Sequence, residues 1–284
     1  MPAEFAPLAG QHIVTIALNV PGPMAAARLR ELGATISKIE PPKGDPLRSF
    51  NTDWYADLAA GMAVETCDLK AADGQARLGE ILATAALLLT AQRPAALTRL
   101  GLNWAKLHKR FPMLCQVAIV GYPAPHQNVA GHDLTYMAVS GLLSPPRLPR
   151  TLFADVAASE QAVTVALAAL LERARTGTGQ YVEVALADAA TRLAEPLRAR
   201  LTRPGALLGG GFPGYNLYPS ADGWIAVAAL EPHFYRRLCE VVSIASPSYA
   251  EFAKCFAAQT GAHWEAFAAT HDLPIAVVSE APAQ

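Results

Sequence analysis

The sequence contains few charged residues and no run of one sign. Asp, Glu, Lys and Arg account for 17% of its 284 residues, the formal net charge is −1, and hydrophobic residues account for 52%. Without a basic run, nothing indicates a nucleic-acid partner. No uninterrupted apolar run reaches the roughly 18 residues of a membrane span, and no basic segment precedes an apolar core as in a secretory signal. We therefore expect a compact cytoplasmic protein that does not enter a membrane and whose apolar surface is partly covered by a partner.

Two common cofactor motifs are also missing. The four cysteines form no C-x-x-C pair and match no zinc spacing, so we predict no metal site. They all lie in apolar segments, which predicts buried free thiols at Cys67, Cys115, Cys239 and Cys255. The turn Pro21-Gly22-Pro23 lacks the glycine pair that admits a pyrophosphate in the G-x-G-x-x-G fingerprint, which argues against NAD binding.

The first half of the chain alternates strand-like and helix-like segments. Short apolar, β-branched runs predict buried strands at residues 12–20, 34–40, 85–91 and 113–122. Segments with helical spacing lie between them, at residues 24–32, 75–84 and 95–110. This βαβ order predicts an α/β fold with a Rossmann-like parallel sheet.

The second half is organised differently. A long Ala/Leu/Val helix is predicted at residues 156–175 and a strand at 180–186, followed by a Gly/Pro loop at 204–214 and a further strand at 224–230. We therefore predict a large Rossmann-like domain at residues 1–185 and a smaller α+β domain at residues 186–284.

A histidine and two carboxylates lie where predicted elements begin. His132 precedes an apolar helical run, and Asp155 and Glu231 each follow an apolar segment. A histidine with two carboxylates at element ends is typical of a proton-transfer site. The apolar neighbours of Asp155 are expected to raise its pKa by desolvation. The alternative is structural: His132-Asp133 and Asp155 also fit helix caps, and Glu231 fits a solvated first-turn acid.

The order of several motifs resembles the class III CoA-transferase superfamily, which includes formyl-CoA transferase and α-methylacyl-CoA racemase. Within it, Gly131-His132-Asp133 and Leu230-Glu231-Pro-x-Phe-Tyr235 are similar to the racemase branch. Further matching motifs are Leu32-Gly-Ala-Thr-Ile-Ser-Lys-Ile-Glu40, Gly44-Asp45-x-x-Arg48, Cys67-Asp-Leu-Lys70, Arg93-Pro94 and Arg175-Thr-Gly-x-Gly-Gln-Tyr-Val-Glu-Val184.

The resemblance implies an acyl-CoA racemase or epimerase, with an acyl-CoA thioester as substrate and coenzyme A as part of it, and with no required cofactor. It also implies an interlocked homodimer with its active site at the interface. His132, Asp155 and Glu231 fall on the racemase catalytic positions. Asp133 is expected to donate its backbone N–H to the thioester oxygen as that oxygen becomes negative.

Fixed cations are expected around the phosphates of coenzyme A. Lys38 and Arg93 follow strands of the predicted parallel sheet, where ligands gather, and Arg48 is a third candidate. All three match basic positions that the family uses for CoA. Plain surface charge is the alternative for each.

Two other functions stay open. One is a CoA transferase in which Asp155 is the nucleophile. The other is a degenerate, non-catalytic family member, which three departures from the family motivate. Residues 54–65 contain no Lys or Arg, Ala157-Ala158-Ser159 replaces glycines that relatives often have, and little sequence follows Glu280.

Overall fold

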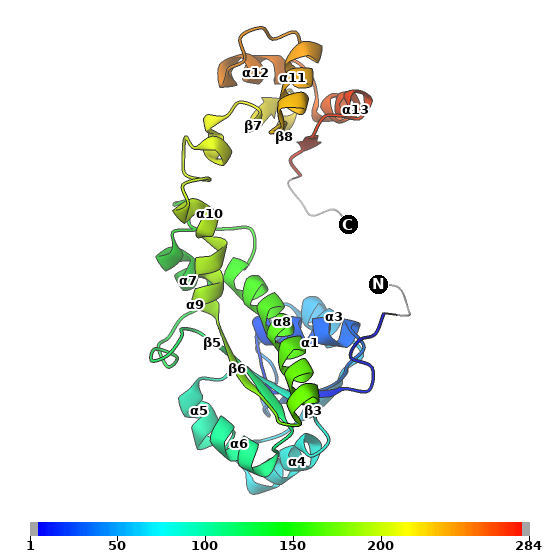
Figure 1. Cartoon of the computed structure of the whole chain (residues 1–284), viewed down its shortest axis with the longest axis vertical. Coiled ribbons are helices and arrows are strands. Elements are labelled where there is room, and N and C mark those ends of the chain that lie inside the picture. Colours follow the sequence, from blue (N-terminus) through cyan, green and yellow to red (C-terminus); the bar gives the residue numbers. More distant parts are fainter. Residues whose placement is uncertain (1–4, 280–284) are drawn as a thin grey trace. The chain divides into compact units, whose positions relative to one another are not determined.

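The computed structural model describes residues 5–279, which form two compact units divided between Ala194 and Glu195 (Figure 1). The domain boundary predicted after residue 185 lies before this division, by the length of one helix. Helix α9 (Leu186–Leu193) follows strand β6 (Tyr181–Ala185) directly and buries Ala187 and Ala190 in a cluster with residues of the first unit, so it belongs to that unit.

The first unit is built on a six-stranded parallel sheet with the order β3-β2-β1-β4-β5-β6. This is the order of a doubly wound nucleotide-binding fold, and it confirms the predicted Rossmann-like sheet. The remaining strands are β1 (His12–Thr15), β2 (Thr35–Glu40), β3 (Ala63–Thr66), β4 (Leu87–Thr90) and β5 (Cys115–Val120).

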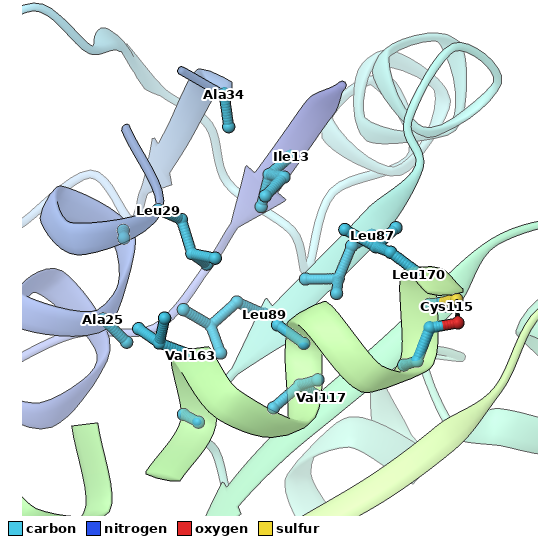
Figure 2. Packing of buried hydrophobic residues seen from close by; sticks show 14 of the residues in the cluster. Ile13, Ala25, Leu29, Ala34, Leu87, Leu89, Cys115, Val117, Val163 and Leu170 are labelled. Atoms are coloured by element: carbon cyan, nitrogen blue, oxygen red, sulfur yellow. Dashed lines mark hydrogen bonds between the residues drawn. The ribbon is translucent and has the colours of Figure 1, made fainter. Parts of the chain in front are cut away.

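Helices pack on both faces of this sheet. The helices of this unit before α9 are α1 (Pro21–Glu31), α2 (Leu47–Phe50), α3 (Thr52–Ala59), α4 (Ala72–Leu82), α5 (Pro94–Arg99), α6 (Trp104–Arg110), α7 (Asp133–Ser140) and α8 (Phe153–Thr176). Because neighbouring strand residues point to opposite faces, Leu87 and Leu89 join one core cluster with α1 and α8, as Figure 2 shows, whereas Leu88 joins the cluster under α4, α5 and α6. Burial on both faces explains why three consecutive leucines stand in the central strand β4.

Two predicted elements differ from the structure. The strand predicted at residues 12–20 ends at Thr15, and the chain reaches α1 through Asn19, whose φ is +68°. The helix predicted at residues 95–110 is divided into α5 and α6, because Gly101 adopts a φ of +71° between them and Asn103 caps α6. The apolar spacing continues across the break, so periodicity alone could not reveal it.

Helix α8 is the one helix among residues 5–279 that is long and apolar enough to span a membrane by length and composition. Its small residues, among them Ala158, Ala162 and Ala166, are fully buried against the sheet and α1. One face of the helix thus packs in the core of the first unit, and 39% of its most apolar stretch is buried.

The second unit contains a three-stranded antiparallel sheet, β7 (Tyr215–Ser220), β8 (Gly223–Ala228) and β9 (Ile275–Val277). Its helices are α10 (Glu195–Arg198), η1 (Leu207–Gly211), α11 (Pro232–Val241), α12 (Tyr249–Phe256) and α13 (Gly261–His271). An aromatic core of Tyr218, Phe252, Phe256 and Trp264 joins the helices to the sheet. This confirms the smaller α+β domain.

The cysteines are free, as predicted, but only Cys67 and Cys115 are buried, and Cys239 and Cys255 are partly exposed. The segment after Glu280, where the family departure was noted, lies outside the described residues.

Candidate active site

A pocket of about 270 Å³ opens at the carboxyl edge of the parallel sheet. Asn19 follows β1, Arg93 follows β4 and Gly121 follows β5, and all three line it. The strand order reverses direction between β1 and β4, and ligands of open α/β sheets bind at such a switch point. His132 and Asp155 also line this pocket, so the fold brings together two of the three predicted catalytic residues.

His132 is the N-cap of α7, and its backbone rather than its ring fixes the start of the helix. The Thr135 hydroxyl accepts a hydrogen bond from the His132 amide at 3.0 Å and donates to its carbonyl oxygen at 2.7 Å. Within residues 5–279, the imidazole itself has no hydrogen-bond partner. The ring is therefore positioned by a capped helix and left available to the pocket.

Asp155 lies in the first turn of α8 and is partly buried. Burial, followed by the nearby negative charge of Asp133, raises its pKa from 3.8 to about 7. A helix N-terminus favours an anion by only about 0.3–1 kcal/mol, so the dipole of α8 does not offset this desolvation. The direction agrees with the expectation from the apolar neighbours of Asp155.

Asp133 has a different role from the one we expected. Its buried carboxylate accepts hydrogen bonds from the backbone amides of Ala154 at 2.7 Å and Asp155 at 3.1 Å. Asp133, at the start of α7, thereby caps the N-terminus of α8. These hydrogen bonds connect the segment that carries His132 to the segment that carries Asp155. The Asp133 backbone N–H, at the first position of α7, has no intrahelical acceptor, and the predicted interaction with a thioester oxygen stays a prediction.

Glu231, the third predicted catalytic residue, belongs to the second unit. It is exposed and is the N-cap of α11, where its carbonyl oxygen accepts from the Tyr235 amide at 3.0 Å. Its predicted catalytic role stays a prediction.

The prediction that Lys38 binds phosphate needs correction. Its ammonium is 1% exposed and donates to Glu40 at 2.5 Å and Asp45 at 2.7 Å, so its charge is already neutralised inside the fold. Asp45 in turn accepts from the Asn19 amide at 2.9 Å. Lys38 therefore supports the loop after β1 that lines the pocket. The sequence showed the lysine but not the two acids that fold onto it.

The other two predicted cations are exposed. The Arg48 guanidinium lies over the ring of Tyr55, 4.8 Å from its centroid, and does not line the pocket. Arg93 lines the pocket directly, and none of residues 5–279 forms an ion pair with it. Among these two, Arg93 is the better placed for an anionic ligand.

A second, basic pocket was not anticipated from the sequence. Its volume is about 590 Å³, and Lys70, Arg99 and Lys106 line it without any acidic residue. Among residues 5–279, none of these cations has an ion-pair partner. Arg93 is the N-cap of helix α5, which ends at Arg99, so the helix connects the two pockets over about 9 Å at 1.5 Å per residue. Lys70 belongs to the motif Cys67-Asp-Leu-Lys70, and this motif was the feature of the sequence that could have indicated the basic pocket.

One departure from the family has little effect on the pocket. Ala158 and Ser159 are buried in the core, and among the described residues none of Ala157, Ala158 and Ser159 lines the pocket. Their methyl and hydroxymethyl groups therefore do not crowd it. Within residues 5–279, no three His, Cys, Asp or Glu side chains are grouped to hold a metal ion.

Comparison with known proteins identifies related chains. The family described as CoA-transferase family III matches residues 8–283. Succinyl-CoA–D-citramalate CoA-transferase from Chloroflexus aurantiacus is 30% identical over 261 positions, which cover 83% of this chain and 65% of that protein. The chain thus spans a little under two thirds of that relative. Alpha-methylacyl-CoA racemase from Mus musculus is 30% identical over 288 positions, which cover 90% of this chain and 74% of that protein.

Solved structures show the same fold. The crystal structure of a hypothetical protein from Mycobacterium tuberculosis has a TM-score of 0.84 and 25% identity, and the match covers 96% of this chain and 83% of that one. A CaiB/BaiF family protein from Brucella suis has a TM-score of 0.81. The sequence relatives include both racemases and CoA-transferases, so similarity does not choose between the two reactions.

Proposed function

Because this chain belongs to CoA-transferase family III, we propose that it is an acyl-CoA racemase or epimerase. It inverts a 2-methylacyl-CoA-like thioester by removing the α-proton on one face and returning a proton on the other. The observation that carries the proposal is the shared pocket of His132 and Asp155, with the pKa of Asp155 at about 7.

A proton relay needs groups that both gain and lose a proton near neutral pH. The raised pKa of Asp155 allows it to act as acid or base, and histidine is the side chain that most often transfers protons in enzymes. When either group takes the α-proton, the C–H electron pair forms the enolate and the thioester oxygen becomes negative. The first amides of α7 and the positive end of its dipole would then stabilise that oxygen.

The basic pocket supports an acyl-CoA as the substrate. Lys70, Arg99 and Lys106 would bind phosphates of coenzyme A, and Arg93 stands between them and the proton-transfer residues along α5. These cations would supply the positive charge for CoA phosphates that residues 54–65, which contain no Lys or Arg, do not supply. Coenzyme A enters as part of the substrate.

CoA transfer is the second candidate, since relatives with equal identity carry that name. In it, the Asp155 carboxylate attacks an acyl-CoA, releases the CoA thiolate and forms a mixed anhydride. A carboxyl with a pKa of about 7 is largely protonated below neutral pH, which weakens it as a nucleophile and favours proton transfer. We further propose that the protein is a homodimer, as the family resemblance implies, that it is cytoplasmic, and that Glu231 is a catalytic residue.

The test is α-proton exchange of 2-methylacyl-CoA in D₂O, followed by NMR. We expect the α-hydrogen to exchange with loss of stereochemistry. His132→Ala should abolish exchange on at least one face, whereas His126→Ala, an exposed histidine outside the pocket lining, should not change it.

Other outcomes identify the alternatives. Acyl exchange between two acids with ping-pong kinetics, without α-exchange, would establish a transferase. A folded protein that does not bind coenzyme A at millimolar concentration would be a non-catalytic family member. Unchanged exchange in His132→Ala would refute the role of this histidine.

A further inference from the structure

Tyr136 is a buried tyrosine whose hydroxyl has no hydrogen-bond partner within residues 5–279. Its side chain is 2% exposed, and it lines the same pocket as His132 and Asp155. Buried tyrosine hydroxyls usually find a partner, because an unpaired buried hydroxyl loses its hydrogen bonds to water without replacing them. The Tyr136 oxygen is not one of the fully buried, unpaired side-chain atoms of residues 5–279. It is therefore accessible from the pocket that Tyr136 lines.

Two glycines leave the space that this hydroxyl occupies. A Cβ at Gly121 would lie 2.5 Å from the Tyr136 oxygen, and one at Gly131 would lie 2.7 Å from it. Neither glycine has a positive φ, so backbone conformation does not require glycine at either position. Both residues line the pocket. The chain thus keeps side chains away from the tyrosine oxygen at the point where the pocket wall is formed.

The ring is held firmly, which fixes the direction of the hydroxyl. Tyr122 packs edge-on against it with a centroid separation of 5.1 Å, and Met137 and Ala190 share its buried cluster. Tyr136 lies one helical turn after His132 on α7, and its amide donates to the His132 carbonyl at 3.2 Å. The hydroxyl is therefore placed by the same element that positions His132.

The hydroxyl stays protonated at neutral pH. Burial, then Tyr122 and Asp155, raise the pKa of Tyr136 to about 12, and Arg93 opposes them. Besides Tyr122, the charged or titratable groups of residues 5–279 around the pocket are Arg93, His132, Asp133 and Asp155. A neutral phenol among them is a hydrogen-bond donor that has no acceptor in this part of the chain.

We propose that Tyr136 is a further catalytic residue, whose hydroxyl donates a hydrogen bond to the thioester carbonyl oxygen of the bound acyl-CoA. This inference rests on the proposed racemase function. The bond strengthens as the α-carbon loses its proton to Asp155 or His132 and the electron pair moves onto the thioester oxygen. Tyr136 keeps its proton throughout, and reprotonation at the α-carbon restores the carbonyl. The glycines leave room for that oxygen.

The test is Tyr136→Phe, which keeps the ring and its packing and removes only the oxygen. Loss of one preorganised donor typically lowers kcat by about 10²–10³-fold. We expect kcat for α-proton exchange to fall by at least about 10-fold, with KM within about 2-fold, since the bond is strongest in the transition state. Tyr122→Phe, its ring neighbour outside the pocket lining, is the matched control and should retain the wild-type kcat.

The outcomes separate this inference from the function on which it rests. Thermal unfolding of both variants checks that each is folded. Wild-type exchange with an unchanged kcat in Tyr136→Phe overturns the role of Tyr136 alone. A fall in kcat of the same size in Tyr122→Phe also overturns it, because a packing effect would then explain both. Absence of exchange in the folded wild-type protein overturns the proposed function, and the role of Tyr136 with it.

Discussion

Asp155→Asn should stabilise the protein at alkaline pH while it removes the proposed proton-transfer group. In the folded chain, burial and Asp133 raise the pKa of Asp155 from 3.8 to about 7. The folded state therefore holds a proton that the unfolded chain releases between these values. By linkage, the unfavourable contribution of Asp155 is absent below pH 3.8, grows as pH rises, and reaches its full value above pH 7.

The size of the effect follows from the difference between the two pKa values. About 3 pKa units at 1.36 kcal/mol each give a destabilisation of about 4 kcal/mol at pH 8, and about 0.5 kcal/mol at pH 4. The dipole of α8 stabilises the ionised carboxylate by only about 0.3–1 kcal/mol, which is smaller than the destabilisation at pH 8. An asparagine of similar size stays neutral at every pH, so it avoids the cost at pH 8.

Urea unfolding at 25 °C, at pH 4 and pH 8, measures this directly. The free energy of unfolding of Asp155→Asn should exceed that of wild type by about 2–4 kcal/mol at pH 8, and by less than about 1 kcal/mol at pH 4. Asp53→Asn, an exposed carboxylate in the first turn of α3, is the control and should change stability by less than about 0.5 kcal/mol at both values. An equal difference at both pH values, or a less stable Asp155→Asn at pH 8, would refute the reasoning.

Two further predictions concern the rest of the site. Asp133→Asn keeps a side-chain oxygen that can cap α8 but removes the negative charge of Asp133, so the pKa of Asp155 should fall. The acid limb of the pH profile of α-proton exchange should then move to lower pH by about one unit. An acid limb at the wild-type pH would contradict this. Lys70→Ala should raise KM for acyl-CoA by about 10-fold at low salt with kcat nearly unchanged. Lys109→Ala, an exposed cation of α6 outside the basic pocket, is its control, and an equal KM in both variants would argue against phosphate binding there.

The local sequence was enough to predict the parallel sheet and to single out two residues that line the candidate pocket. A strand that is buried on both faces is apolar at consecutive positions. The run Leu87, Leu88 and Leu89 shows this pattern in the sequence alone, before any neighbouring strand is known. His132 and Asp155 could be singled out because each begins a helix, and the apolar neighbours of Asp155 already indicated a raised pKa. The break between α5 and α6 escaped this reasoning, since Gly101 interrupts the helix without interrupting its apolar spacing.

The sequence by itself therefore determined the family and the order of the elements except β3, which no predicted strand covers, because apolar periodicity and motif spacing are local properties of the chain. Only the tertiary structure decided which charged groups are free to act. Lys38 and Lys70 look alike in the sequence, but Glu40 and Asp45 fold onto the first, whereas no acid of residues 5–279 forms an ion pair with the second. Asp133 shows the same dependence on the fold, because its carboxylate reaches the amide of Asp155 across 22 residues of chain. Charge pairing and desolvation depend on distances between segments that meet only when the sheet is assembled.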